Sequence, residues 1–283
     1  MTSPEPREWR YDVRDDRHEP ERVPGVDVIA AFDFDGTLTR GGSVWHFLTS
    51  LVGRKEVASA GASLATQLAR AAVVGGTAAD DAKEALFVRT LAGLDAAEVA
   101  ARAATFGPEH YHRHCRTEVR ARVDWHRNQG HVLLLVSASP ELYVEPVGEE
   151  LGFDGVLATR LEIDPDGLLT GRFAGRNCRG PEKLERLEEW VDALWSEDPH
   201  DADDEGYGPA DEDGVDRRAK RTASAMHAPT AGANERPFLW AYGNSAGDRQ
   251  LLAAADIGID AGRLGRIGAL RRYRRLGDVL TAW

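Results

Sequence analysis

The stretch AAFDFDGTLT (residues 30–39) continues an apolar run that begins at Val28, and it ends that run on two aspartates, Asp33 and Asp35. Asp, Gly and Thr are common residues of surface turns, so an acidic turn is one interpretation. The other interpretation is a site whose chemistry needs two neighbouring carboxylates. The organisation of the rest of the chain decides between them.

Apolar strands and amphipathic helices alternate along much of the sequence. The run VLLLV (132–136) is apolar at every position, which suits a strand covered on both faces. We predict strands at 28–32, 132–136, 238–242 and 257–259, and a hairpin of 156–162 with 168–173. We predict helices at 116–129, 181–195 and 250–255, and one that Ser139 caps, that starts at Pro140 and that Gly152 ends. This alternation predicts an α/β fold with a Rossmann-like three-layer core, in which helices cover both faces of a parallel sheet.

Three segments depart from this alternation. Residues 44–112 are rich in Ala and Leu at helical spacing, which predicts a helical cap inserted between core segments 27–43 and 113–283. Residues 1–26 are polar and lack the apolar centre of a signal peptide, so we expect a disordered leader. Residues 196–236 are acidic and then small and polar. They offer little apolar surface to bury, which predicts a disordered loop within the core.

Composition excludes several classes of function. The 283-residue chain is 42% hydrophobic and carries a net charge of −12, which disfavours nucleic acid and anionic membranes as partners. The apolar run 57–74 is interrupted by Gln67 and Arg70, so we do not expect a membrane span. Cys115 and Cys178 lack metal-type spacing and are expected to be free thiols in a reducing compartment, which predicts a cytoplasmic protein. Nothing in the sequence indicates an oligomeric state.

Polar residues follow several of the predicted strands. Asp33 and Asp35 follow the first strand, Ser137 follows the run 132–136, and Asn244 and Asp248 follow the strand 238–242. Lys183 stands at the start of the helix 181–195. Ligands of open parallel sheets bind at the carboxyl ends of the strands, so these side chains are expected to converge on one site. A lone serine, lysine or aspartate at such a place is usually an ordinary turn or surface residue, and only their joint occurrence favours a site.

The order of these motifs resembles the haloacid dehalogenase superfamily, in its phosphoserine-phosphatase-like branch with a helical cap after the first motif. DFDGT (33–37) resembles the first motif of that superfamily, Ser137 in VSAS the second, Lys183 the third, and GNSAGD (243–248) the fourth. The resemblance implies that Asp33 is the nucleophile that forms an aspartyl-phosphate. It implies that Asp35 is the general acid and base.

The resemblance also implies the remaining roles. Asp33, Asp35 and Asn244 would hold one Mg²⁺, an ion that prefers oxygen ligands. Thr37, Ser137 and Lys183 would bind the phosphate, and Asp248 would orient a metal-bound water. The implied activity is hydrolysis of a small phosphorylated metabolite. Dehalogenation is disfavoured, because the superfamily members that perform it lack the second aspartate.

Two positions depart from the pattern of that branch. Many relatives carry aspartate where this chain has Asn244, and an amide brings an oxygen without a charge. Phosphoserine phosphatases carry an acidic residue where this chain has Gly42, so a substrate other than phosphoserine is expected. Two alternatives to the metabolite phosphatase stay open at this stage, a lipid-phosphate phosphatase of the same branch and a low-turnover regulatory or binding protein that kept the fold.

Several other residues allow two interpretations. His110, His112 and His114 could suggest a metal cluster, but their spacing of two spreads them around a helix, and we do not expect a metal there. Trp45 and His46 would either line the substrate side of the cap or pack within it. Lys83 and Arg89 could meet a second anionic group of the substrate, although a solvated helix face is the commoner role of such residues.

Overall fold

The parallel sheet is the centre of the fold. A computed structural model describes residues 28–196, 236–262 and 273–276, so the predicted leader (1–26) and nearly all of the predicted loop 196–236 lie outside the described residues. Six parallel strands follow the order β3-β2-β1-β6-β7-β8. They are β1 (Val28–Phe32), β2 (Val132–Pro140), β3 (Gly155–Thr159), β6 (Phe238–Gly243), β7 (Ile257–Asp260) and β8 (Arg274–Arg275). The predicted α/β fold is confirmed.

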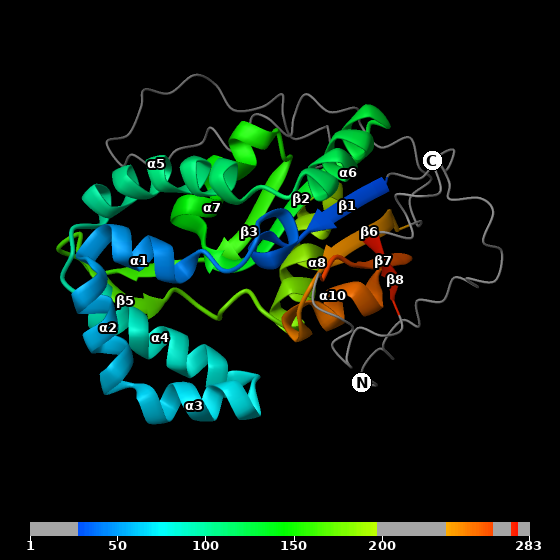
Figure 1. The fold of residues 1–283 in the computed structure, drawn as a ribbon. Helices are drawn as coiled ribbons and strands as arrows, with labels where there is room; N and C mark the ends of the chain where they lie inside the picture. Colours follow the sequence, from blue (N-terminus) through cyan, green and yellow to red (C-terminus); the bar gives the residue numbers. More distant parts are fainter. Residues whose placement is uncertain (1–27, 197–235, 263–272, 277–283) are drawn as a thin grey trace, which may run out of the picture.

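Helices cover both faces of this sheet (Figure 1). Helices α6 (Thr117–Asn128) and α7 (Glu141–Leu151) share one apolar core with Ala30 and Phe32 of β1. Helices α8 (Pro181–Ser196) and α10 (Arg249–Ala254) share the opposite core with Ile29 and Ala31. Because successive strand residues point to opposite faces, a strand between two helical layers is apolar at every position.

The helical insertion lies on the side of the molecule to which the strands point (Figure 1). We use the term cap helices for α1 (Val44–Val52), α2 (Arg54–Ser63), α3 (Ala65–Val74), α4 (Thr77–Leu91) and α5 (Ala96–His114). Helix α5 packs closely on α7 at Gly107, where a Cβ atom would lie 2.1 Å from the main-chain oxygen of Tyr143. The cap helices are therefore seated directly on the core.

The predicted hairpin strand 156–162 is wrong, because this segment belongs to two different sheets. Its first half is β3, which pairs in parallel with β2. Its second half is β4 (Leu161–Ile163), which pairs antiparallel with β5 (Leu169–Phe173). The small sheet packs against α4, where the rings of Phe87 and Phe173 lie 6.0 Å apart. Both halves have strand-forming residues, and they differ only in the strand with which each one pairs, β2 for the first half and β5 for the second.

The junction between β2 and α7 also differs from the prediction. We expected Ser139 to cap a helix starting at Pro140, but β2 continues to Pro140 and α7 begins at Glu141. Pro140 has extended backbone angles and pairs with Thr159 of β3. The Ser139 side chain binds a carboxylate instead of capping the helix, so a tertiary contact replaces the local one.

Candidate active site

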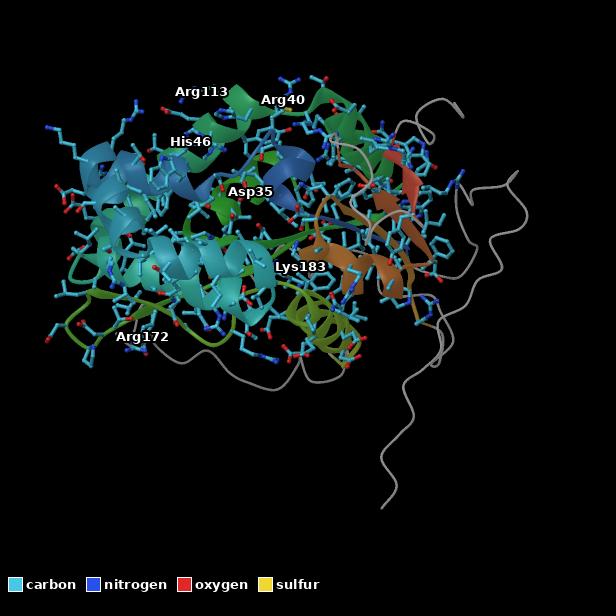
Figure 2. The ribbon with its side chains drawn as sticks, turned by 60° about the horizontal axis from the view of Figure 1, so that its bottom comes forward. Asp35, Arg40, His46, Arg113, Arg172 and Lys183 are labelled. Carbon is cyan, nitrogen blue, oxygen red and sulfur yellow. The ribbon has the colours of Figure 1, made fainter. Side chains whose placement is uncertain are left out.

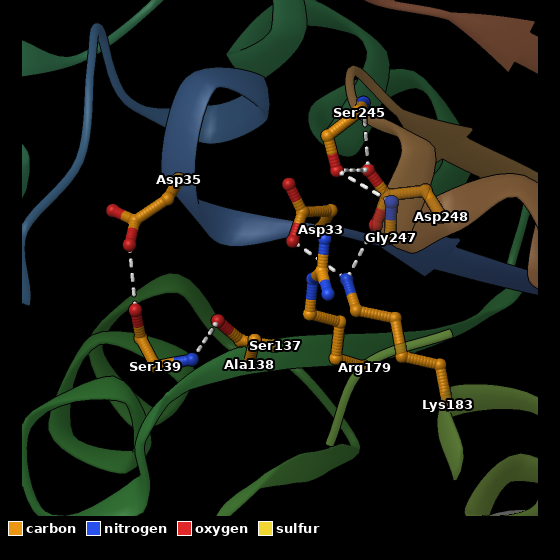
Figure 3. A pocket seen from close by; sticks show the side chains of 10 residues that line it. All are labelled: Asp33, Asp35, Ser137, Ala138, Ser139, Arg179, Lys183, Ser245, Gly247 and Asp248. Atoms are coloured by element: carbon orange, nitrogen blue, oxygen red, sulfur yellow. Dashed lines mark hydrogen bonds and ion pairs between the residues drawn. The ribbon is translucent and has the colours of Figure 1, made fainter. Parts of the chain in front are cut away.

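The predicted site residues converge at the carboxyl ends of the three central strands. Strand β1 has β2 on one side and β6 on the other, so the chain order changes direction at β1, which is where open α/β sheets bind ligands. One pocket is lined by ten residues from these strand ends and from the loops beside α8 and α10 (Figure 3): Asp33, Asp35, Ser137, Ala138, Ser139, Arg179, Lys183, Ser245, Gly247 and Asp248.

Three buried charges occupy the floor of this pocket. The Lys183 Nζ atom lies 2.7 Å from Asp33 Oδ1 and 2.6 Å from Asp248 Oδ1, so one ammonium bridges two carboxylates (Figure 3). Burial and the charge of Asp248 raise the pKa of Asp33 to about 7, against the opposing effect of Lys183. Burial alone would also raise the pKa of Asp248, but Lys183 and Ser245 hold it below its usual value. The pKa values of the two carboxylates are therefore shifted in opposite directions.

Thr37 and Asn244 approach the other oxygen of Asp33. Thr37 Oγ1 donates to Asp33 Oδ2 over 3.0 Å and is fully buried. It therefore faces the carboxylate and does not line the pocket. Gly36 makes this packing possible, because its φ is +80° and a Cβ atom there would lie 2.1 Å from the Asn244 amide. The glycine of DFDGT thus brings β1 and the loop after β6 into contact.

The residues around Asn244 fit a hard cation. The nearer end of its amide lies 3.1 Å from Asp33 Oδ2 and 3.0 Å from the main-chain oxygen of Asp35. With its oxygen toward them, Asn244 would complete three oxygen ligands suited to Mg²⁺. With its nitrogen toward them, it donates to both in the absence of metal. Within the described residues no group of three or more His, Cys, Asp or Glu forms a metal site, so the set relies on an amide and a main-chain carbonyl.

Replacing Asn244 by aspartate is expected to strengthen Mg²⁺ binding. A second carboxylate adds a full charge to the ligand set, and we expect the half-saturating Mg²⁺ concentration to fall about tenfold. The measurement is the shift of the thermal midpoint during a Mg²⁺ titration, which does not require turnover. The exposed Asn128→Asp variant is the matched control. A titration curve of Asn244→Asp identical to that of the unchanged protein would contradict the assignment.

Asp35 is held by a different set of groups. Its carboxylate accepts hydrogen bonds from the Ser43 main-chain nitrogen (2.9 Å), from Ser43 Oγ (2.9 Å) and from Ser139 Oγ (2.6 Å). Tyr143 lies behind Ser43, with 2.7 Å between the hydroxyl oxygens. The carboxylate thus points toward Ser139 and away from Asp33 (Figure 3). Burial raises the pKa of Asp35, while the bonds from Ser139 and Ser43 oppose that rise.

Ser137 is buried within β2, where we had expected the end of the strand. Its Oγ accepts a hydrogen bond from the Ser139 main-chain nitrogen at 3.0 Å, which leaves its hydroxyl hydrogen free to be donated to a ligand. Ser137 and Ser139 are two positions apart and share one face of β2, so strand periodicity could have identified Ser139 as a site residue. No comparable signal pointed to Ser43, Tyr143 or Arg179.

The other residues singled out in the sequence lie outside the pocket lining. Trp45 is 47% exposed, and His46 and Arg89 are also exposed. Figure 2 shows Asp35 and Lys183 toward the middle of the molecule, with His46 and Arg113 nearer its periphery. Lys83 differs from Arg89, because its Nζ reaches the main-chain oxygen of Ala138 in the pocket wall. Cys115 and Cys178 are free thiols, as predicted.

The histidines of α5 form an aromatic stack. The ring centroid of His110 lies 4.3 Å from that of His114, 5.4 Å from that of His46 and 5.2 Å from that of Phe106. The Nε2 atom of His110 is buried and makes no hydrogen bond within the described residues. Burial, together with His114 and His46, lowers the pKa of His110 to about 4.

This stack predicts a loss of stability in acid. Unfolded histidine titrates near 6.5, so between pH 6.5 and 4 the unfolded chain binds more protons than the native one, and stability falls as the pH falls. The His110→Phe variant keeps the ring stack. Between pH 7 and 4.5, we expect its free energy of unfolding to fall by about 2 kcal/mol less than that of the unchanged protein. Urea unfolding at pH 7, 5.5 and 4.5 measures it. The exposed His112→Gln variant should keep the slope of the unchanged protein, and an equal slope in His110→Phe would refute the prediction.

The protein thus combines a parallel α/β sheet, an aspartate directly after strand β1, a lysine that bridges two carboxylates, and cap helices inserted between β1 and β2. A family model described as haloacid dehalogenase-like hydrolase matches residues 30–208. The chain therefore belongs to the haloacid dehalogenase-like hydrolase family.

Individual relatives agree with this membership. Protein CicA of Caulobacter vibrioides is 34% identical over 172 residues, which is 61% of this chain and 73% of CicA. A Bordetella pertussis Tohama I protein of unknown function has a similar structure, with a TM-score of 0.63, 21% identity, and coverage of 88% of this chain and 98% of that one. A phospho-aspartyl intermediate analogue of phosphoserine phosphatase gives a TM-score of 0.54 with 17% identity, over 90% of this chain and 98% of that one. At these identities the structural matches show a shared fold.

Membrane-spanning segments were sought among the helices of the described ranges. None of these helices alone has the length and apolar composition to cross a membrane. Helices α2 and α3 satisfy the test together, but they are bent by 73° at their junction.

Proposed function

We propose that this protein hydrolyses phosphomonoesters through an aspartyl-phosphate on Asp33. The observation that carries the proposal is the pair of contacts on this one carboxylate, with Lys183 on Oδ1 and Thr37 on Oδ2. Both contacts lie beside a pocket lined by hydroxyl groups and cations. A carboxylate fixed in this way can attack phosphorus in line, and the neighbouring cations can neutralise the phosphoryl oxygens.

The proposed reaction has two steps. An oxygen of Asp33 bonds to phosphorus while the phosphorus–alkoxide bond breaks, and the departing alkoxide takes a proton from Asp35. In the second step Asp35 takes a proton from water, whose oxygen attacks phosphorus and releases Asp33 and phosphate. Ser137 and Lys183 would hold the phosphoryl oxygens, and Asp248 would keep Lys183 in place. A Mg²⁺ held by Asp33, Asn244 and the Asp35 carbonyl would supply further positive charge.

Phosphoserine is not the substrate we propose. The position that carries a carboxylate in phosphoserine phosphatases is Gly42, and a Cβ atom there would find nothing within 4 Å. A bound substrate ammonium would therefore have no carboxylate partner at this position.

A chromogenic phosphomonoester assayed with Mg²⁺ and with a chelator tests the proposal. We expect Mg²⁺-dependent release of phosphate and, after rapid quenching in acid, a covalent phosphoprotein that loses its phosphate on treatment with hydroxylamine. The absence of turnover on this ester and on a panel of metabolite esters would instead favour a binding protein that kept the fold. The cytoplasmic location stays a prediction.

One observation favours a lipid phosphate as a second candidate substrate. Val73 and Val74, at the end of α3, are 87% and 64% exposed, and α3 has no buried residue. Such an apolar end could touch a lipid surface. Flotation with neutral liposomes separates the two candidates, because a protein specific for metabolites should stay in the aqueous fraction.

A further inference from the structure

Within the described residues, Lys83 of the cap helix α4 is a cation whose direct hydrogen bonds all go to uncharged groups. Its Nζ donates to two neutral oxygens, the main-chain oxygen of Ala138 and Asn177 Oδ1, the latter at 3.0 Å. The rings of Phe87 and Phe173 each lie 5.4 Å from it. Among the described residues no carboxylate lies within 4.0 Å of Nζ. Burial disfavours the charged ammonium more than Asp35 and Asp80 favour it, so the site favours the arrival of an anion.

Arg179 brings a second cation to the same side of the pocket. It lies in the loop before α8 and lines the pocket together with Ala138, the residue that Lys83 contacts (Figure 3). Its Nη1 donates to the Gly76 main-chain oxygen at 3.1 Å, and the carboxylate of Asp80 is 3.7 Å away. Most of the guanidinium donors thus have no protein partner within the described residues, and the side chain is 27% exposed.

Asn177 connects Lys83 to Asp80, the carboxylate that lies near Arg179. Its Oδ1 accepts from Lys83, and its Nδ2 donates to Asp80 Oδ1 over 2.6 Å, so both ends of the amide bind the cap helix α4. Thr159 also donates to Asn177 Oδ1, over 2.8 Å, and fixes the amide from the core. Asp80 lies 3.7 Å from Arg179, and the oxygens of Asp35 are hydrogen-bonded to Ser43 and Ser139. Lys83 and Arg179 thus place two cations on the Ala138 side of the pocket, and neither shares a hydrogen bond with a carboxylate within the described residues.

We infer that Lys83 and Arg179 bind a second anionic group on the alcohol part of the substrate. This inference rests on the proposed function and assigns its substrate class, a small phosphomonoester whose alcohol carries a carboxylate or a second phosphate. The phosphate would lie at Asp33 and Lys183, and the second anion would lie toward the cap, beyond Asp35. Because Lys83 also binds the main-chain oxygen of Ala138, the anion is recognised next to the end of β2 that carries Ser137.

Four non-hydrolysable phosphonates that share a two-carbon spacer and differ in their terminal group test the inference by calorimetry, in the presence of Mg²⁺. They are 3-phosphonopropionate, ethane-1,2-diphosphonate, propylphosphonate and 2-aminoethylphosphonate. We expect the first or the second to bind about tenfold tighter than propylphosphonate, and the aminated compound to bind most weakly. The first two compounds distinguish a carboxylate from a second phosphate. Equal affinity for the anionic compounds and propylphosphonate would overturn the inference.

Two variants test whether Lys83 and Arg179 cause the preference for an anionic phosphonate over propylphosphonate, and a third variant is the control. Lys83→Met and Arg179→Met keep apolar stems, and each should reduce the tenfold preference to about threefold or less. Arg89→Met, an exposed change on the same helix α4, should retain it. Retention of the preference in both Lys83→Met and Arg179→Met would also overturn the inference. Binding is read without turnover, so failure of the phosphatase assay and failure of this subsite give different results.

Discussion

Asp33→Asn is expected to lower phosphatase activity by a factor of at least about 10⁴, because it removes the proposed nucleophile. The other two carboxylates of the pocket are held by their own partners, Asp35 by Ser43 and Ser139 and Asp248 by Lys183 and Ser245. The variant should nevertheless fold at least as stably as the unchanged protein. Burial and the neighbouring charge of Asp248 raise the pKa of Asp33 to about 7, so its ionised form is disfavoured in the native state. Asparagine keeps the shape and removes that charge.

The difference in stability between Asp33→Asn and the unchanged protein should depend on pH. Because the native pKa of Asp33 lies above the unfolded value of 3.8, stability from the protonated carboxyl is present below pH 4 and is lost as the pH rises through 7. In chelator, the thermal midpoint of Asp33→Asn should therefore exceed that of the unchanged protein at pH 8 and approach it at pH 5.

The matched control is Asp248→Asn, the same substitution at the other carboxylate bound by Lys183. The pKa of Asp248 is lowered, so its ionised form stabilises the native state, and its loss should reduce the thermal midpoint. Phosphate release by Asp33→Asn near the original rate, or equal changes of stability in the two variants, would refute the assignment.

Lys183→Met is expected to destabilise the protein by about 3–5 kcal/mol at pH 8 and to remove most activity. Lys183 is 1% exposed, and its ammonium is the cation that bridges Asp33 and Asp248. Methionine fills the same volume but leaves two buried carboxylates facing each other. Denaturant unfolding at pH 8 measures the loss, which should shrink near pH 5, where one carboxylate can take up a proton.

A double-mutant cycle tests the cause of that loss. The Asp33→Asn/Lys183→Met variant has one buried carboxylate left in place of two, so it should recover about 1–3 kcal/mol relative to Lys183→Met. Strictly additive changes in the cycle would show that Lys183 stabilises the fold through packing alone.

Much of the architecture could be predicted from residue patterns. Strand β1 was predicted at its exact bounds, because all five of its residues are apolar and Asp33 ends the run. The segment 156–162 was predicted as one strand, since nothing in its composition marks the change from the large sheet to the small one at Arg160. Strand β2 extends past its apolar run because Pro140 pairs with Thr159, a partner that lies far from it along the sequence.

The sequence by itself determined the parallel sheet, the helical insertion and the identities of the groups at the strand ends. These follow from local periodicity and from motif order, both of which are properties of neighbouring residues. Only the tertiary structure decided that Asp35 turns to Ser43 and Ser139, and that Lys83 reaches Ala138 in the pocket wall. Those contacts join segments up to 104 residues apart, and their geometry depends on how the cap helices are seated on the core.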